Sequence, residues 1–257
     1  MRRRFISVAE ALRLWPPPPG KGGHWPDSTD AQAIRQMTTA QWAGISKRTP
    51  TYLKGYRDAP GSQDRAQRRA EWLASLPLWN GMASVLEVGC GAGRNLACLS
   101  RRRPELRVLG ADICPEAVGE ARRILPGGQV GLLDLYEVPE WPDTFVADAV
   151  LTCGVLCHLE PSVLPGVLRA LAVRARRRLV LVEHFDARKG GVCLKGPKPW
   201  RPELRDTGAY MLWTLHRGRI FGSLWQHLER VGWSPQTIEI PRDLQAPGAT
   251  EVLVLSA

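Results

Sequence analysis

The stretch VLEVGCGAGRN, residues 85–95, decides the fold. It begins as an apolar run that carries Glu87, and glycines then follow at positions 89, 91 and 93. Glycine adopts positive φ readily and lets a ligand approach the backbone closely. A glycine loop between a strand and a helix therefore indicates a ligand site, and the helical pattern of NLACLSRR follows directly.

Apolar runs alternate with helical stretches on the carboxyl side of this loop. The pattern predicts strands and crossover helices, which is typical of a parallel sheet covered on both faces. Two further strands, PQTIEI and TEVLVLSA, are about ten residues apart and predict an antiparallel end. We therefore expect an α/β, Rossmann-like fold with a seven-stranded, mostly parallel sheet whose last strand is antiparallel. The expected strands before these two are 84–89, 107–112, 129–135, 148–154 and 177–185, and the expected helices are 95–102, 115–125, 161–174 and 222–233.

The two flanks of this pattern differ from it in composition. Residues 1–80 predict a helical or irregular N-terminal cap with a Pro/Gly-rich loop at 16–23, and its strongest helix spans Ser62 to Leu76. Residues 81–257 form the expected ligand-binding domain, with an insertion at about 187–220 that covers the edge of the sheet.

Three kinds of glycine loop can be compared with this one. A nicotinamide-binding fingerprint needs its third glycine five positions after the first, where this chain has Arg94. A phosphate-binding P-loop needs a following Gly-Lys-Ser/Thr, which is absent here. The pattern E-x-G-x-G-x-G instead resembles motif I of the class I S-adenosylmethionine (SAM) dependent methyltransferases. The resemblance covers about 83–257 and implies a transferase that uses SAM as its cofactor.

Further acids follow at the spacing of that family. Asp112 ends the second strand, where an acid would bind both ribose hydroxyls. Asp134 ends the third predicted strand, where the family places an acid near the adenine amino group. The residues expected to bind the cofactor are Glu87, Gly89, Gly91, Gly93, Asp112, Asp134 and Cys153.

A narrower resemblance concerns the acceptor. The segments GRNL (93–96), GVLCHLEP (154–161) and VEHF (182–185) are similar to methyltransferases associated with pseudaminic acid and related sugar biosynthesis. This sequence departs from that pattern at Cys157, where isoleucine is usual, and at His184, where an aromatic residue is usual. The resemblance implies a sugar or amino-sugar acceptor.

Catalytic candidates follow the fourth and fifth strands, because sites of open parallel sheets lie beyond the carboxyl ends of the strands. His158 is the first candidate for a general base, and Glu183 and His184 are candidates for contacting the acceptor or the methionine end of SAM. Thr152, Cys153, Gly154 and Asp186 are expected nearby. The aromatic and basic side chains Tyr52, Tyr56 and Arg57 either close over the cofactor or only pack on the sheet.

Other chemistries are disfavoured by particular residues. Thr152-Cys153-Gly154-Val155 stands where amino methyltransferases of bases or glutamine have N/D-P-P-Y/F. No proline precedes Cys153, so a core thiol is favoured over a cytosine-attacking nucleophile. Cys153 and Cys157 lack the third cysteine of a radical-SAM cluster, and no metal site is expected. No CxxC pair occurs, so the six cysteines are expected to be reduced in a cytoplasmic protein.

The net charge of +10 leaves the partner open. The first 80 residues carry 13 basic and 6 acidic residues, so an RNA or DNA methyltransferase is one alternative. Arginine outnumbers lysine 29 to 6, which a GC-rich coding sequence alone would produce. A non-catalytic SAM-binding protein is the other alternative. We expect a small-molecule acceptor, no transmembrane span because no run of 18 apolar residues exists, and no defined oligomeric state from sequence.

Overall fold

The structure is a computed structural model and describes a defined part of the chain. The described residues are 5–6, 35, 39–40, 42–44, 53, 62–159, 164–183, 191–195, 210–214, 234–245 and 251–256. The predicted loop at 16–23 and the predicted helix at 222–233 lie outside these ranges.

The main sheet has seven strands in the order β4-β3-β2-β5-β6-β10-β9. Strands β4, β3, β2, β5 and β6 run parallel, whereas β10 is antiparallel to both β6 and β9. The predicted α/β class and the antiparallel last strand are therefore confirmed. The strands span Ser84–Val88 (β2), Arg107–Asp112 (β3), Gln129–Leu132 (β4), Ala147–Cys153 (β5), Ala175–Val182 (β6), Ser234–Glu239 (β9) and Glu251–Ser256 (β10).

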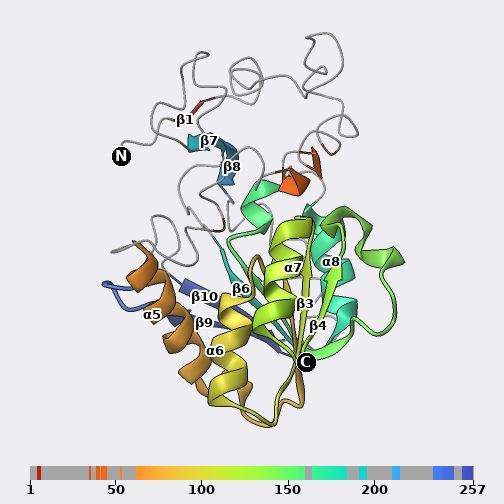
Figure 1. The fold of residues 1–257 in the computed structure, drawn as a ribbon. Coiled ribbons are helices and arrows are strands. Elements are labelled where there is room, and N and C mark those ends of the chain that lie inside the picture. The colour runs from red at the N-terminus through yellow and green to blue at the C-terminus, as the bar shows by residue number, and fades with distance from the viewer. Residues whose placement is uncertain are drawn as a thin grey trace.

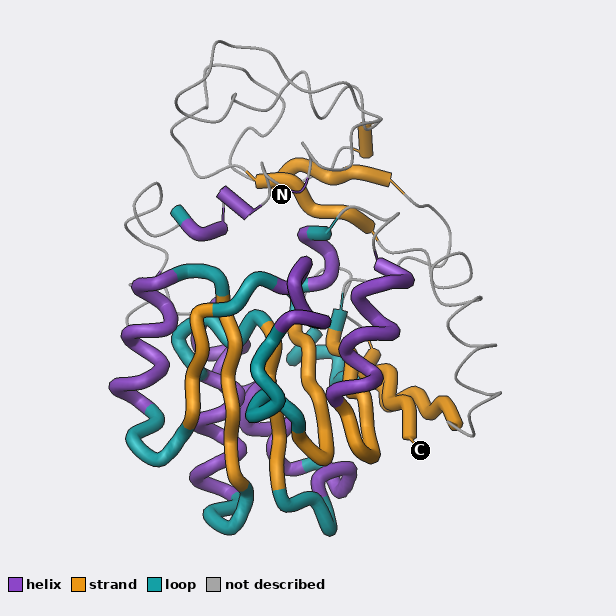
Figure 2. Tube along the Cα trace, turned by 90° about the vertical axis from the view of Figure 1, so that its right-hand side faces the viewer, coloured by secondary structure: helices purple, strands orange, loops and turns teal. Residues whose placement is uncertain are grey.

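Helical elements cover both faces of this sheet, as Figures 1 and 2 show. Alternate residues of each strand point to opposite faces, so Val85 and Leu86 join two different apolar clusters. One cluster includes side chains of α5, η1, α6 and α7, and the other includes side chains of η2, η3 and α8. These elements span Ser62–Ser75 (α5), Pro77–Trp79 (η1), Arg94–Arg102 (α6), Pro115–Ile124 (α7), Leu135–Glu140 (η2), Leu156–His158 (η3) and Leu164–Arg174 (α8).

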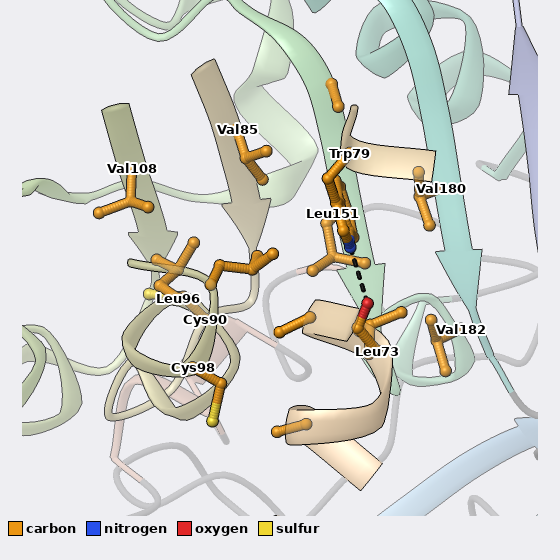
Figure 3. Packing of buried hydrophobic residues seen from close by; sticks show 14 of the residues in the cluster. Leu73, Trp79, Val85, Cys90, Leu96, Cys98, Val108, Leu151, Val180 and Val182 are labelled. Atoms are coloured by element: carbon orange, nitrogen blue, oxygen red, sulfur yellow. Dashed lines mark hydrogen bonds between the residues drawn. The ribbon is translucent and has the colours of Figure 1, made fainter. Parts of the chain in front are cut away.

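The helix predicted over 62–76 packs against the main sheet and contributes side chains to its hydrophobic core. Leu73 and Trp79 are buried in the same cluster as Val85 and Leu151 of the central strands (Figure 3). The Trp79 Nε1 donates a hydrogen bond of 2.7 Å to the Leu73 carbonyl, so the buried indole keeps a polar partner. Helix α5 therefore packs with α6 on one face of the sheet.

A second sheet of three strands joins distant segments. It has the order β1-β7-β8, with β1 at Phe5–Ile6, β7 at Gly191–Lys195 and β8 at Tyr210–Thr214. The predicted insertion thus contributes a hairpin, and its β7 strand pairs antiparallel with the N-terminal strand. Strand β8 lies against η3, which follows the carboxyl end of β5, and Figure 2 shows this sheet beyond that side of the main sheet.

Two predicted boundaries were wrong by a few residues. Strand β4 ends at Leu132 rather than at residue 135, because the Asp134 side chain accepts the Tyr136 amide and turns the chain into η2. Asp134 therefore lies two residues past the strand and not at its end. Strand β6 begins at Ala175, directly after α8, and ends at Val182. Glu183 is consequently the first residue beyond that strand.

None of the described helices is both long enough and apolar enough to cross a bilayer.

Candidate functional site

The glycine loop connects β2 to α6 at the carboxyl end of the sheet. Gly89, Gly91 and Gly93 have φ values of +70°, +54° and +81°, which side chains other than glycine rarely adopt. The Gly89 amide donates to the Ala111 carbonyl at 2.8 Å, and the Gly93 amide donates to Cys90 at 2.9 Å. The first bond holds the loop against the end of β3, and the second closes a turn within the loop.

The space beside Gly89 also leaves no room for a side chain at this position. A Cβ atom at Gly89 would lie 2.4 Å from Cγ2 of Val155, well inside van der Waals contact. Val155 precedes η3, so the glycine loop packs directly against the loop that follows β5. The two halves of the candidate site therefore meet at this contact.

Glu87 lies within β2 and is 1% exposed. Its Oε1 accepts a 2.6 Å hydrogen bond from Nδ2 of Asn95 in the first turn of α6, whereas Oε2 has no hydrogen-bond partner among the described residues. Burial raises the pKa of Glu87 to about 8, although the bond from Asn95 opposes that rise. The chain thus keeps a buried carboxyl oxygen available beside the glycine loop.

Asp112 ends β3 and faces the same loop. Its Oδ2 accepts the Gly91 amide at 2.7 Å and its Oδ1 accepts the Cys114 amide at 2.9 Å. Burial raises the pKa of Asp112, and these backbone hydrogen bonds oppose the rise. Each carboxylate oxygen has a second lone pair, so the group retains capacity for ligand hydroxyls.

Asp134 is next along the same edge, because the Leu133 amide donates to the Asp112 carbonyl. Its Oδ1 accepts the Tyr136 amide at 2.9 Å, and its Oδ2 accepts the Thr39 hydroxyl at 3.0 Å. Asp134 therefore caps η2 and anchors a residue from the N-terminal segment. Its expected contact with adenine remains a prediction.

Thr152 and Cys153 are the last residues of β5 and point to opposite faces. Thr152 is fully buried, and its hydroxyl has no hydrogen-bond partner within the described part of the chain. Cys153 packs against the cluster of α5 and α6, and burial raises the pKa of its thiol to about 11. A thiol of that pKa is protonated near neutral pH, which is a core thiol's behaviour rather than a nucleophile's.

The loop after β5 is tied to the end of β6. The Gly154 amide donates to the Val182 carbonyl at 2.9 Å, and the Val155 amide donates to Oε1 of the fully buried Glu183 at 3.1 Å. Glu183 therefore holds the loop that carries His158. The His158 ring is half-buried, with its centroid 4.2 Å from that of Trp42.

Several predicted residues are not placed by the structure. His184, Asp186, Tyr52, Tyr56 and Arg57 lie outside the described residues, and their roles stay predictions. Within the described part, no three His, Cys, Asp or Glu side chains gather as a metal site would require. The described residues bring Glu87, the three glycines and Asp112 together at one loop.

Sequence reasoning missed three residues that the structure places here. Asn95 lies eight residues after Glu87, at the second position of α6, and that spacing was an available signal. Thr39 contacts Asp134, 95 residues further along the chain, and Trp42 contacts His158, 116 residues further along. A local sequence pattern does not predict contacts between such distant residues.

A family comparison supports the fold assignment. Residues 85–177, from β2 into β6, match the family model described as "Methyltransferase domain". Together with the strand order, this match assigns the described core to the Rossmann-like fold of class I methyltransferases.

Curated relatives match a part of the chain. The chain is 39% identical over 114 residues to the trans-aconitate 2-methyltransferase of Methylobacterium nodulans, covering 43% of this chain and 42% of the relative. It is 28% identical over 145 residues to the enzyme of the same name from Azoarcus sp., covering 56% of each. The chain thus spans about half the length of the curated relatives it matches.

Solved structures resemble the chain over a greater length. The magnesium protoporphyrin IX methyltransferase of Synechocystis with bound SAM has a TM-score of 0.58 at 18% identity, covering 87% of this chain and 96% of that one. Phosphoethanolamine N-methyltransferase 1 of Haemonchus contortus has a TM-score of 0.59 at 16% identity, covering 89% and 50%. Likeness at this identity establishes the fold alone.

Proposed function

We propose that this chain is a SAM-dependent methyltransferase that acts on a small-molecule acceptor. One observation carries the proposal: a glycine loop with three positive-φ glycines lies between two acids, the buried Glu87 and the part-buried Asp112. The available Oε2 of Glu87 distinguishes this loop from a purely structural turn.

The residues fit the parts of SAM without requiring a phosphate site. Asp112 would accept the ribose hydroxyls with its remaining lone pairs. The glycine loop would approach the methionine end with its backbone. Glu87 would release its proton as the positively charged ammonium group approaches and would then accept a hydrogen bond from it through Oε2. Asp134 would face the adenine amino group if its bond from Thr39 is exchanged or shared.

SAM supplies an electrophilic methyl group on a sulfonium. The chain's own residues then have to orient an acceptor for in-line attack and take up a proton if the acceptor is a hydroxyl. His158 is our candidate for that proton acceptor, through one imidazole nitrogen. Glu183 contributes by holding the Val155 amide, which fixes the loop that carries His158.

Two observations bear on the acceptor class. The matched curated relatives are named for trans-aconitate, an acidic small molecule, and this chain has a net charge of +10. The narrower sequence resemblance pointed to a sugar or amino sugar, and none of the relatives reported above bears such a name. We therefore propose a small-molecule acceptor and include both carboxylates and sugars in the test.

The N-terminal part has its own place in this proposal. We propose that residues 1–80 provide the cap and that residues 81–257 provide the methyltransferase domain, with the insertion at about 187–220. Because α5 and η1 belong to the core cluster of the sheet, we assign the covering role within residues 1–80 to those before Ser62.

The test is methyl transfer from radiolabelled SAM into extract fractions that separate small molecules, nucleic acid and protein. Label is expected in the small-molecule fraction, and defined trans-aconitate and nucleotide-sugar samples then distinguish the two acceptor classes. Asp112→Ala serves as the control for contaminating activity.

Two results would contradict the proposal. Label recovered in nucleic acid would favour the RNA or DNA methyltransferase that the basic N-terminal flank permits. Binding of SAM with no transfer into any fraction would indicate a non-catalytic SAM-binding protein.

A further inference from the structure

Residues near the N-terminus reach the same end of the sheet as the candidate site. Arg35, Thr39 and Trp42 are each in helical conformation. Arg35 donates to Oε1 of Glu137 at 2.9 Å and lies 5.3 Å from the centroid of the Tyr136 ring. Short described pieces of this segment, red to orange in Figure 1, lie beyond the ends of α7 and α8.

The contacts of this segment fall on three successive loops of the main domain. Arg35 and Thr39 hold the loop after β4, through Glu137 and Asp134. Trp42 packs with Leu53 against buried residues at the start of α7, which follows β3. The same Trp42 ring meets His158 after β5, at a tilt of 54° between the planes.

Trp42 is therefore the residue that bridges the cofactor side and the acceptor side. Its packing on Cys114 and Ala117 places it next to the loop that begins at Asp112. Its contact with His158 places it against the candidate base. Both neighbours at α7 are at most 1% exposed, so the indole rests on a fixed surface.

Two features of the structure act on His158: the turn that carries it and the ring of Trp42. η3 is a single three-residue turn, and His158 is its last residue. The backbone of this turn is held by one hydrogen bond, in which the His158 amide donates to the Val155 carbonyl at 3.0 Å. Its side chain projects toward residues that another part of the chain supplies, and an aromatic ring at 4.2 Å restricts the imidazole's rotation.

We propose that Trp42 is a positioning residue that sets the orientation of the His158 imidazole at the candidate active site. The role of His158 rests on the proposed function, but the contact itself does not. The N-terminal segment thereby contributes to catalysis without touching the reacting atoms. Leu53 packs on the same α7 surface and provides the matched control.

The test uses the full chain with isotope-labelled histidine, observed by NMR with and without S-adenosylhomocysteine. The His158 signals are assigned by their loss in His158→Gln. The parent is expected to show nuclear Overhauser contacts between the Trp42 indole and the His158 ring, with upfield displacement of the His158 ring protons. Trp42→Leu should lose that displacement and Trp42→Phe should retain part of it.

Leu53→Ala should leave the His158 signals at their parental positions, because it removes packing on α7 alone. Unchanged His158 signals in Trp42→Leu would overturn the inference. If Trp42→Leu fails to fold, the absence of indole contacts in the parent, or unaltered signals in Trp42→Phe, would overturn it equally. Retained contacts in a parent that does not bind S-adenosylhomocysteine would instead contradict the proposed function, and with it the role of His158.

Discussion

The two halves of the candidate site are built in different ways. In the β2–β3 half, each acid is held by residues at most 21 positions away: Glu87 by Asn95, and Asp112 by Gly91 and Cys114. In the β5–β6 half, the Val155 amide depends on Glu183, and His158 contacts Trp42, 116 residues earlier. The proposed cofactor half is thus built within one segment of the chain, whereas the proposed acceptor half depends on residues from separate segments.

The largest effect is expected on the rate of methyl transfer when His158, in the β5–β6 half, is replaced. His158→Gln should lower the rate of methyl transfer by about 100-fold to 10,000-fold, the range that a lost general acid–base group produces. S-adenosylhomocysteine affinity should stay within about tenfold, because His158 takes no part in the hydrogen bonds that hold Glu87 and Asp112. Transfer is measured with labelled SAM and the acceptor-containing fraction, and binding by calorimetry.

An equal loss of binding and of transfer in that variant would show that the two halves are not separable. A parental rate would remove His158 from the list of candidate bases.

The next effect tests the local half alone. Asp112→Ala removes an acceptor for the ribose hydroxyls and also frees the Gly91 and Cys114 amides. Hydrogen bonds to charged groups contribute roughly 1.5–3 kcal/mol each, so S-adenosylhomocysteine should bind at least about 100-fold more weakly. Calorimetric titration measures this loss.

The structure also predicts how a conservative change behaves. Both oxygens of Asp112 accept backbone N–H groups, so Asp112→Asn would place an amide nitrogen against one of these donors. Asparagine should therefore weaken binding as well. Asp143 is exposed before β5, so Asp143→Ala is the matched control and should bind at the parental level.

Sequence reasoning succeeded where the signal was a local pattern of residues. The strands around Glu87 and Asp112 and the two strands at the antiparallel end of the sheet followed from apolar runs and glycine spacing. The three-stranded sheet joining Phe5–Ile6 to Gly191–Lys195 was not predicted, because pairing between such distant segments leaves no local period. Thr39 and Trp42 escaped prediction for the same reason, whereas Asn95 was detectable from its spacing to Glu87.

A third prediction concerns pH. Burial raises the pKa of Glu87 from 4.5 to about 8, so the folded chain holds a proton there that the unfolded chain releases above 4.5. This contribution to stability is fully present below pH 4.5 and is lost as the pH rises toward about 8. Between pH 5.5 and 7 the loss should be about 2 kcal/mol, at roughly 1.4 kcal/mol per pH unit.

Denaturant unfolding of the parent and of Glu87→Gln, repeated at several pH values across this range, isolates the contribution of Glu87 to the free energy of unfolding. The free energy of unfolding of the parent relative to the variant should fall as the pH rises. A constant difference would show that Glu87 ionises normally in the folded chain.

The smallest expected effect concerns the N-terminal strand. Deleting residues 1–23 removes β1, but the contacts to the loops after β3 and β4 come from Arg35, Thr39, Trp42 and Leu53. Affinity for S-adenosylhomocysteine should therefore change by less than about tenfold, or ~1.4 kcal/mol. A folded truncation that no longer binds would place the cofactor contacts further toward the N-terminus.

The central claim is that the glycine loop between Glu87 and Asp112 binds SAM and not a nicotinamide cofactor. Thermal unfolding of the parent chain with S-adenosylhomocysteine or with NADH tests this claim most directly. A ligand at 100 times its Kd should stabilise the fold by ~2.7 kcal/mol. We expect that stabilisation with S-adenosylhomocysteine and none with NADH, whereas stabilisation by NADH alone would contradict the account.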